Sequence, residues 1–213
     1  MAQHVPRFTT IVVTGLGSAS AKPDQAELRL GVSTKGATAT EALTKNAESM
    51  GRIMEKIKAM EMVEEIETSR FSLRPDYSRM VEKLEGLIVD HVFRVTTTDL
   101  DKVGEIIDKA VETGANKVEM INYTFKRDTL EELSKRARQK AMSDAKAKAE
   151  TIADSLGVEI VGISNAIEDT YPYTKGAPPP LASGVSPMIA PPTEKEIVVQ
   201  IKVTFVTKSR NPN

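Results

Sequence analysis

Chemistry in this sequence would depend on few residues, because the chain has no cysteine and only two histidines. His91 follows Asp90 in the alternating segment LIVDHVFRV, and Ser164 lies further along in GISN. A histidine, a carboxylate and a serine form a hydrolase triad only when all three groups meet. Neighbouring strand side chains point to opposite faces, so Asp90 should point away from its neighbour. We therefore favour a buried, hydrogen-bonded His91, with a hydrolase built around it as a lesser alternative.

The pair Gly15 and Gly17 follows the apolar run IVVT and resembles part of a dinucleotide-binding loop. Such a loop leads into a helix, whereas here Pro23 follows and the next segment alternates as a strand. We expect a flexible turn between adjacent strands instead. No cofactor is expected at this turn. No metal is expected either, because cysteine ligands are absent and the histidines are isolated.

The segment KRARQKAMSDAKAKAETIADSLG places basic residues among alanines in one expected helix. A helical wheel of about 100° per residue predicts a buried stripe made of Leu130, Ala137, Ala141, Ala145, Ile152 and Leu156. The cations scatter around the wheel, and acidic residues three or four positions away can pair with them. The formal net charge of the chain is only −1. A membrane surface or a nucleic acid needs clustered positive charge, so neither is the expected partner.

Strand and helix periods alternate between residues 26 and 126. Strand periods cover 26–33, 65–73, 87–95 and 117–126, and helix periods cover 38–60 and 99–114. This order predicts an α+β fold, a ferredoxin-like split β-α-β plait with an antiparallel sheet and both helices on one face. Asn46 is a polar residue on the apolar stripe of the first helix and should bond to backbone. An RNA-binding plait is disfavoured, because its strands would carry stacking aromatics.

An extra long helix and additional strands complete the predicted single domain, residues 1–213. The strands are expected at residues 10–14, 158–167 and 196–208, and the last should bury one apolar face inside a sheet. A proline-rich loop at about 170–193 contains no period. Such a loop is either solvated and mobile or binds a partner. Its apolar residues are the candidate oligomer contacts, namely Tyr171, Tyr173, Leu181, Met188 and Ile189.

Several ordered motifs together resemble the SIMPL domain family. They include VVTGLGSASAKPDQAELRLGV, TATEA through NA, IET followed by LRPDY, and the alanine-rich helix ending in LG. The resemblance covers about Ile11 to Phe205. It implies an envelope protein of bacteria or archaea with no established catalytic activity. Relatives are described as periplasmic immunogenic or oxidative-stress-related proteins, and homo-oligomers, including ring or channel-like assemblies, occur among them.

The resemblance therefore predicts a non-catalytic, self-assembling envelope protein of periplasmic or extracytoplasmic location. The printed chain begins without an apolar run of signal-peptide length, and none of its segments is long enough to span a membrane. Its composition fits a cytoplasmic location as well. A module that binds a small ligand or a peptide through the proline-rich loop is the main alternative, and the ligand is unknown.

Overall fold

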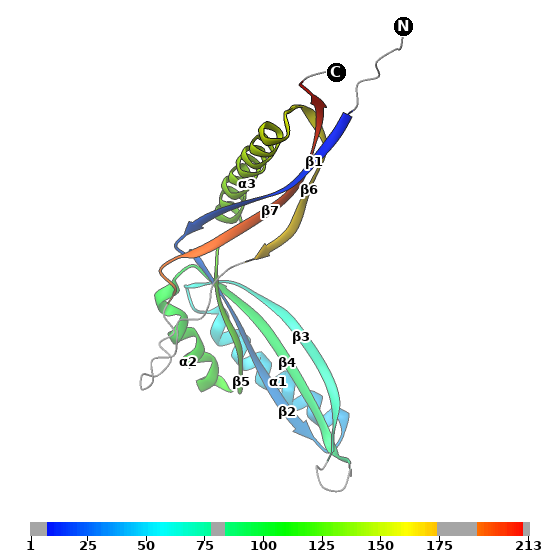
Figure 1. Ribbon diagram of the computed structural model, residues 1–213. Coiled ribbons are helices and arrows are strands. Elements are labelled where there is room, and N and C mark those ends of the chain that lie inside the picture. Colours follow the sequence, from blue (N-terminus) through cyan, green and yellow to red (C-terminus); the bar gives the residue numbers. More distant parts are fainter. Residues whose placement is uncertain (1–7, 78–83, 174–190, 211–213) are drawn as a thin grey trace, which may run out of the picture. The chain divides into compact units, whose positions relative to one another are not determined.

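The computed structural model describes residues 8–77, 84–173 and 191–210, with only the backbone described at 169–173. These residues group into two compact units (Figure 1). Unit 2 is built from Pro23–Lys126 together with residues 191–193, and unit 1 from the other described segments on either side of Pro23–Lys126. The predicted α+β class with antiparallel sheets is confirmed. The additional strands do not extend the sheet of unit 2, because they form a sheet of their own.

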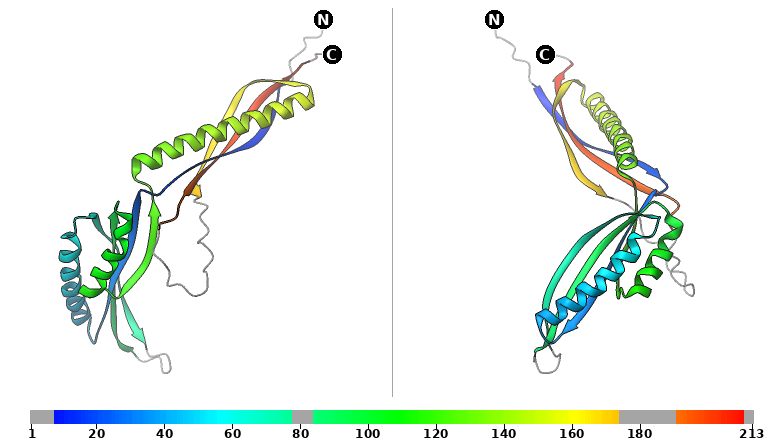
Figure 2. Two further views of the ribbon diagram at one scale, coloured as in Figure 1. Left: turned by 90° about the vertical axis from the view of Figure 1, so that its left-hand side faces the viewer. Right: turned by 180° about the vertical axis from the view of Figure 1, so that it is seen from behind.

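Unit 2 holds a four-stranded antiparallel sheet in the order β3-β4-β2-β5. Along the chain its elements are β2 (Gln25–Gly36), α1 (Ala39–Lys58), β3 (Val63–Tyr77), β4 (Leu84–Thr97), α2 (Val103–Thr113) and β5 (Lys117–Thr124), with a 3-10 turn at Leu100–Lys102. Both helices pack on one face of the sheet (Figure 2). Leu28, Leu30 and Phe93 are fully buried beneath them.

Asn46 behaves as its position on α1 predicts. Its side-chain amide donates to the backbone oxygens of Val32, at 3.2 Å, and Val89, at 3.3 Å. These two oxygens belong to the neighbouring strands β2 and β4. The buried amide nitrogen therefore joins α1 to both central strands, whereas the buried side-chain oxygen of Asn46 has no hydrogen-bond partner among the described residues.

Unit 1 holds a three-stranded antiparallel sheet in the order β1-β7-β6, with α3 on one face. Its elements are β1 (Phe8–Ala21), α3 (Arg127–Leu156), β6 (Val158–Tyr173) and β7 (Lys195–Ser209). The closing strand β7 is the central strand, and the apolar face predicted for it, from Ile197 to Phe205, is buried. Figure 2 shows α3 running along this sheet.

The expectation of a turn at Gly15 and Gly17 is wrong, because both glycines lie inside β1. A Cβ atom on Gly17 would lie 2.1 Å from the backbone oxygen of Ala137, and one on Gly15 would lie 2.0 Å from that of Ala141. The glycines therefore let the helix backbone approach the strand far more closely than side chains allow. The glycine pair, which suggests a flexible turn when only the sequence is considered, instead allows the helix to pack closely on the strand.

The buried stripe of α3 also differs in part from the predicted one. Alanines 137, 141 and 145 are buried as expected, but the stripe continues through Leu133, Ala149 and Ala153. Ile152 and Leu156 are exposed instead. A strict spacing of four residues selects this row, and it gives the low ridge that fits against the two glycines.

Two Gly→Ala substitutions test the close approach. Gly17→Ala should lower the free energy of unfolding by at least about 2 kcal/mol, because the added carbon meets helix backbone that cannot move aside. Gly51→Ala is the matched control within α1, where an added Cβ has nothing within 4 Å. It should raise stability by about 1 kcal/mol through helix propensity. Urea denaturation measures both, and equal midpoints would contradict the packing described.

Candidate functional site

The described contacts of the His91 side chain are with a threonine hydroxyl and an aromatic ring. Its Nε2 atom lies 3.3 Å from the Thr68 hydroxyl, and its ring meets Phe71 edge-on with centroids 5.3 Å apart. Burial lowers the pKa of His91, so the ring is neutral near pH 7. Ser164 belongs to unit 1, where its hydroxyl donates to the backbone oxygen of Thr204. The predicted hydrogen-bonded His91 is confirmed, although the ring is half-buried rather than buried.

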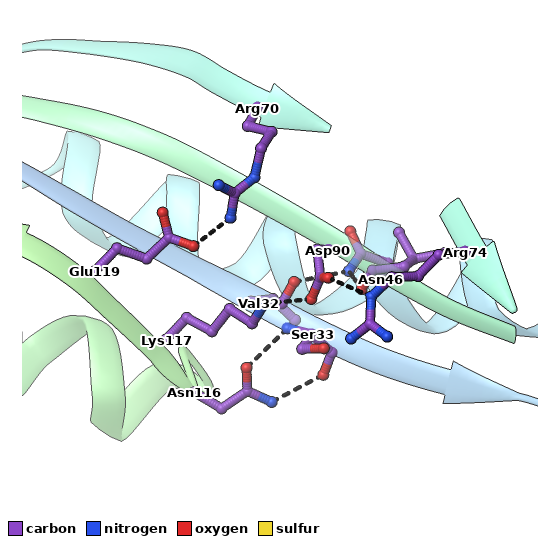
Figure 3. A network of polar contacts seen from close by, with 10 residues as sticks. Val32, Ser33, Asn46, Arg70, Arg74, Asp90, Asn116, Lys117 and Glu119 are labelled. Carbon is purple, nitrogen blue, oxygen red and sulfur yellow. Dashed lines mark hydrogen bonds and ion pairs between the residues drawn. The ribbon is translucent and has the colours of Figure 1, made fainter. Parts of the chain in front are cut away.

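Asp90 projects from the other face of the sheet, as the strand period predicts, and it is the centre of a polar network (Figure 3). Its side chain is only 8% exposed. Oδ1 lies 2.5 Å from Nζ of Lys117, and Oδ2 lies 3.3 Å from Nε of Arg74. One buried carboxylate therefore has two cationic partners, from strands β5 and β3 on opposite edges of the sheet.

Strand β2 carries small residues where these contacts cross it. Lys117 reaches Asp90 past Gly31 and Ser33, which lie between β4 and β5 in the sheet. A second ion pair joins Arg70 of β3 to Glu119 of β5, across both central strands. Larger side chains on β2 would block both crossings. The small residues therefore allow the two edge strands to be tied together.

Asn116 extends the pairing of β5 with β2 to the residue before the start of β5. Its side-chain oxygen accepts from the backbone N–H of Ser33 at 2.7 Å, and its side-chain nitrogen donates to the Ser33 backbone oxygen at 2.9 Å. The amide side chain thus replaces one residue of a strand ladder. This contact holds Lys117, the next residue, in place to reach Asp90.

Two opposing effects set the pKa of Asp90. Burial alone would raise the pKa, but hydrogen bonds from Lys117, Ser33 and Arg74 to the charged form outweigh it and lower the pKa to about 2. Asp90 is therefore ionised near neutral pH, so it cannot donate a proton there, and a carboxylate with so low a pKa is a weak general base. Its network joins strands of the sheet.

Unit 1 presents a second feature, a row of α3 side chains along the outer edge of β1. Lys140 donates to the backbone oxygen of Ser18 at 2.8 Å, and Lys148 donates to that of Thr14 at 3.0 Å. Asp144 accepts from the N–H of Leu16 at 2.8 Å. We call Lys140, Asp144 and Lys148 the edge row.

The edge row satisfies the backbone groups that an additional strand would otherwise bind. Residues 14, 16 and 18 face away from β7, at the strand period of two, and the row meets them at the helix spacing of four. The pKa of Asp144 is lowered by the hydrogen bonds from Lys148 and Leu16, so the acceptor stays charged. This half of the β1 edge is therefore closed to strand pairing, as natural sheet edges commonly are.

Several basic residues of α3 form ion pairs within unit 1. Arg136 pairs with Glu132, Arg138 with Glu168 of β6, and Lys146 with Glu150. Together with the edge row, these pairs engage Arg136, Arg138, Lys140, Lys146 and Lys148 within unit 1. The sequence contained a signal for the edge row, because Lys140, Asp144 and Lys148 recur every four residues, but only the strand partner reveals its role.

Strand β6 is the opposite edge of the sheet, and its side chains from Val161 to Ile167 are exposed. Val161 is exposed, and Ile163 and Ile167 are each 54% exposed. The strand departs from regular pairing with β7 at three places. Two candidate oligomer contacts, Tyr171 and Tyr173, lie in the final residues of this strand. The other three candidates, Leu181, Met188 and Ile189, lie outside the described residues.

Within residues 8–77, 84–173 and 191–210, no group of three or more His, Cys, Asp or Glu side chains is placed to bind a metal ion. No helix in the same part of the chain is both long and apolar enough to cross a bilayer.

Comparison with known families identifies the chain. The model of the SIMPL family, described as a protein of unknown function (DUF541), matches residues 11–205. The chain belongs to the SIMPL family. This confirms the resemblance seen in the sequence motifs, and the match covers segments of both units.

The chain is also similar to a protein named as immunogenic and to proteins named as uncharacterized. The 26 kDa periplasmic immunogenic protein of Brucella melitensis is 31% identical over 182 residues, which are 82% of this chain and 71% of the relative. The uncharacterized protein YggE of Escherichia coli K12 is 23% identical over 210 residues, 96% of this chain and 82% of YggE. YggE of Edwardsiella ictaluri is 24% identical over 163 residues, 75% of this chain and 67% of that protein.

Acid unfolding of this SIMPL-family chain tests the Asp90 network. The pKa of Asp90 is about 2 in the folded chain and near 4 in the unfolded chain, so ionised Asp90 stabilises the folded state at pH values above about 4. This contribution to stability disappears as the pH falls toward 2. Between pH 5 and pH 2 the parent should lose about 2 kcal/mol more stability than Asp90→Asn. Urea denaturation at each pH measures this difference. Parallel pH profiles would show that Asp90 is not held ionised by its partners.

Proposed function

We propose that this SIMPL-family chain is a non-catalytic envelope protein that assembles with copies of itself. The observation that carries the proposal is the edge strand β6, sixteen residues long, whose described side chains include three exposed aliphatic groups. Sheet edges of this kind favour pairing with another chain. The candidate contacts Tyr171 and Tyr173 lie at the end of the same strand, followed by the proline-rich segment.

We propose that the chain is not catalytic because the contacts of His91 and Asp90 do not match those of catalytic groups. His91 faces Thr68 and Phe71 in unit 2, and Asp90 is engaged by two cations. A general base activates a nucleophile when a third group orients it. His91 contacts the Thr68 hydroxyl but no carboxylate among its described contacts, and the Asp90 carboxylate, which also accepts from Ser33, is held by two cations. The two polar residues most suited to chemistry therefore serve packing and strand association.

An extracytoplasmic location is proposed from the relatives. The Brucella protein is named as periplasmic, and it aligns with most of this chain. A chain without cysteine needs no particular redox compartment. Detection of the tagged protein in the periplasmic fraction of the source cells, with a cytoplasmic marker as control, tests this part.

Two architectural proposals accompany the function. We assign unit 2 to the ferredoxin-like plait, which is supported by its order β2-α1-β3-β4-α2-β5 and by the sheet order β3-β4-β2-β5. We also regard units 1 and 2 together as one SIMPL domain, residues 1–213. This is supported by the family match, which runs through segments of both units without a break.

Light scattering of the parent and two variants tests self-assembly. The parent should exceed the monomer mass at tens of micromolar. Ile163→Lys should lower that mass, because an ammonium group would be buried at the contact. Val12→Lys, which changes another exposed aliphatic residue in the same sheet, should leave it unchanged.

Replacing residues 173–191 by a short Gly-Ser linker tests the role of the proline-rich segment. The mass should fall while the helical circular dichroism signal is retained. A parent that is monomeric would overturn the proposed assembly, whereas a shortened chain of full mass would remove only this segment from the contact.

A further inference from the structure

We infer that β6 of one copy pairs antiparallel with β6 of a second copy around a two-fold axis, which extends two three-stranded sheets into one of six strands. This inference rests on the proposed self-assembly and adds to it the surface, the partner strand and the symmetry. It follows from comparing the two edges of the sheet in unit 1.

The first edge, β1, is closed along its second half. The edge row occupies the outward backbone groups of Thr14, Leu16 and Ser18. A strand from another copy would have to displace Lys140, Asp144 and Lys148 to pair there. Only residues 8–13 of β1 remain for such a contact, which is less than half of the strand. Head-to-tail pairing of β1 with β6 of another copy is therefore disfavoured.

The second edge, β6, has no comparable row of helix side chains among its described contacts. Its two described carboxylates are already paired within unit 1. Glu159 lies 3.3 Å from Lys208, and Glu168 lies 2.6 Å from Arg138. The edge is therefore close to neutral, and a second β6 would not meet it with unpaired negative charge. Like charges directly opposite each other would otherwise destabilise the pair.

Symmetry favours the same strand on both sides. Because the β1 edge is blocked, the β6 edge of one copy can pair only with the β6 edge of another. A two-fold axis relates the two copies in such a contact, and the resulting dimer leaves no further β6 edge to pair. In an antiparallel pair of identical strands, a residue near the axis faces itself. A register centred on Ile163 sets Glu159 opposite Ile167, and Glu168 opposite Val158. Acidic residues do not face each other in that register, and Ile163 packs on its own copy.

The irregular pairing of β6 is compatible with this contact. Extra residues fall at Val161 and at Ser164, where the register against β7 shifts. A bulge increases the twist of a strand and re-aims side chains. Twist protects an edge from indiscriminate pairing, but two identical strands twist alike, so their curvature matches. Two β6 strands would thus meet with the same twist.

Cysteine scanning gives a direct test, because the chain contains no cysteine of its own. Single cysteines are placed at Gly162, Ile163, Ser164, Asn165 and Ala166, all exposed. A disulfide requires Cα atoms about 4.4 to 6.8 Å apart, so only a residue close to the axis can link to itself. Ser20→Cys on β1 and Gln200→Cys on β7 are exposed controls in the same sheet.

We expect covalent dimers on a non-reducing gel to peak at one β6 position and to fall on either side of it. The Ser20 and Gln200 variants should stay several-fold below that peak. Circular dichroism confirms that each variant is folded. A parent heavier than a monomer whose β6 variants link no more than the controls would overturn this inference alone. A monomeric parent would overturn both this inference and the proposed function.

Discussion

The close approach of α3 to β1 is the constraint on which unit 1 depends. Glycines at positions 15 and 17 remove the side chains that would separate strand from helix, and the alanine row of α3 presents only methyl groups. At this separation, side chains as short as aspartate can reach the strand backbone. The edge row therefore exists because of the glycines. A helix held further away by larger side chains would leave the β1 edge open, and the sheet would have two edges to protect rather than one.

In unit 2, one face of the sheet carries no helix of the unit. Long charged side chains cross that face, and Val92 is only 1% exposed under them. A buried ion pair contributes little net stability compared with an apolar pair, since the carboxylate of Asp90 loses its hydration. The ion pairs of Asp90 instead specify which strands lie next to each other in the sheet. An unpaired Asp90 in a slipped register would be costly, so the network favours the observed strand order over alternatives.

Sequence periodicity predicted the parts of this fold that depend on local pattern. The alternation in β2, β4 and β7 and the apolar stripe of α1 led to the correct elements, and Asn46 was placed correctly against backbone. The motifs also identified the family. Failures occurred where the partner of a residue lies far away in sequence. The role of Gly17 depends on Ala137, and that of Asp90 depends on Arg74 and Lys117. Isolated in sequence, Gly17 looks like a turn residue and Asp90 like an outward strand residue.

The central claim is that the β1 edge of the sheet is closed to strand pairing and the β6 edge is open. Hydrogen–deuterium exchange at several protein concentrations tests this claim most directly. Exchange should be followed by mass spectrometry across the range in which the mass of the parent changes. Peptides from residues 158–168 should exchange more slowly as concentration rises, because the outward amides of β6 gain partners. Peptides from residues 8–21 should be protected to the same extent throughout. Concentration-dependent protection of β1 with an unchanged β6 would contradict the account.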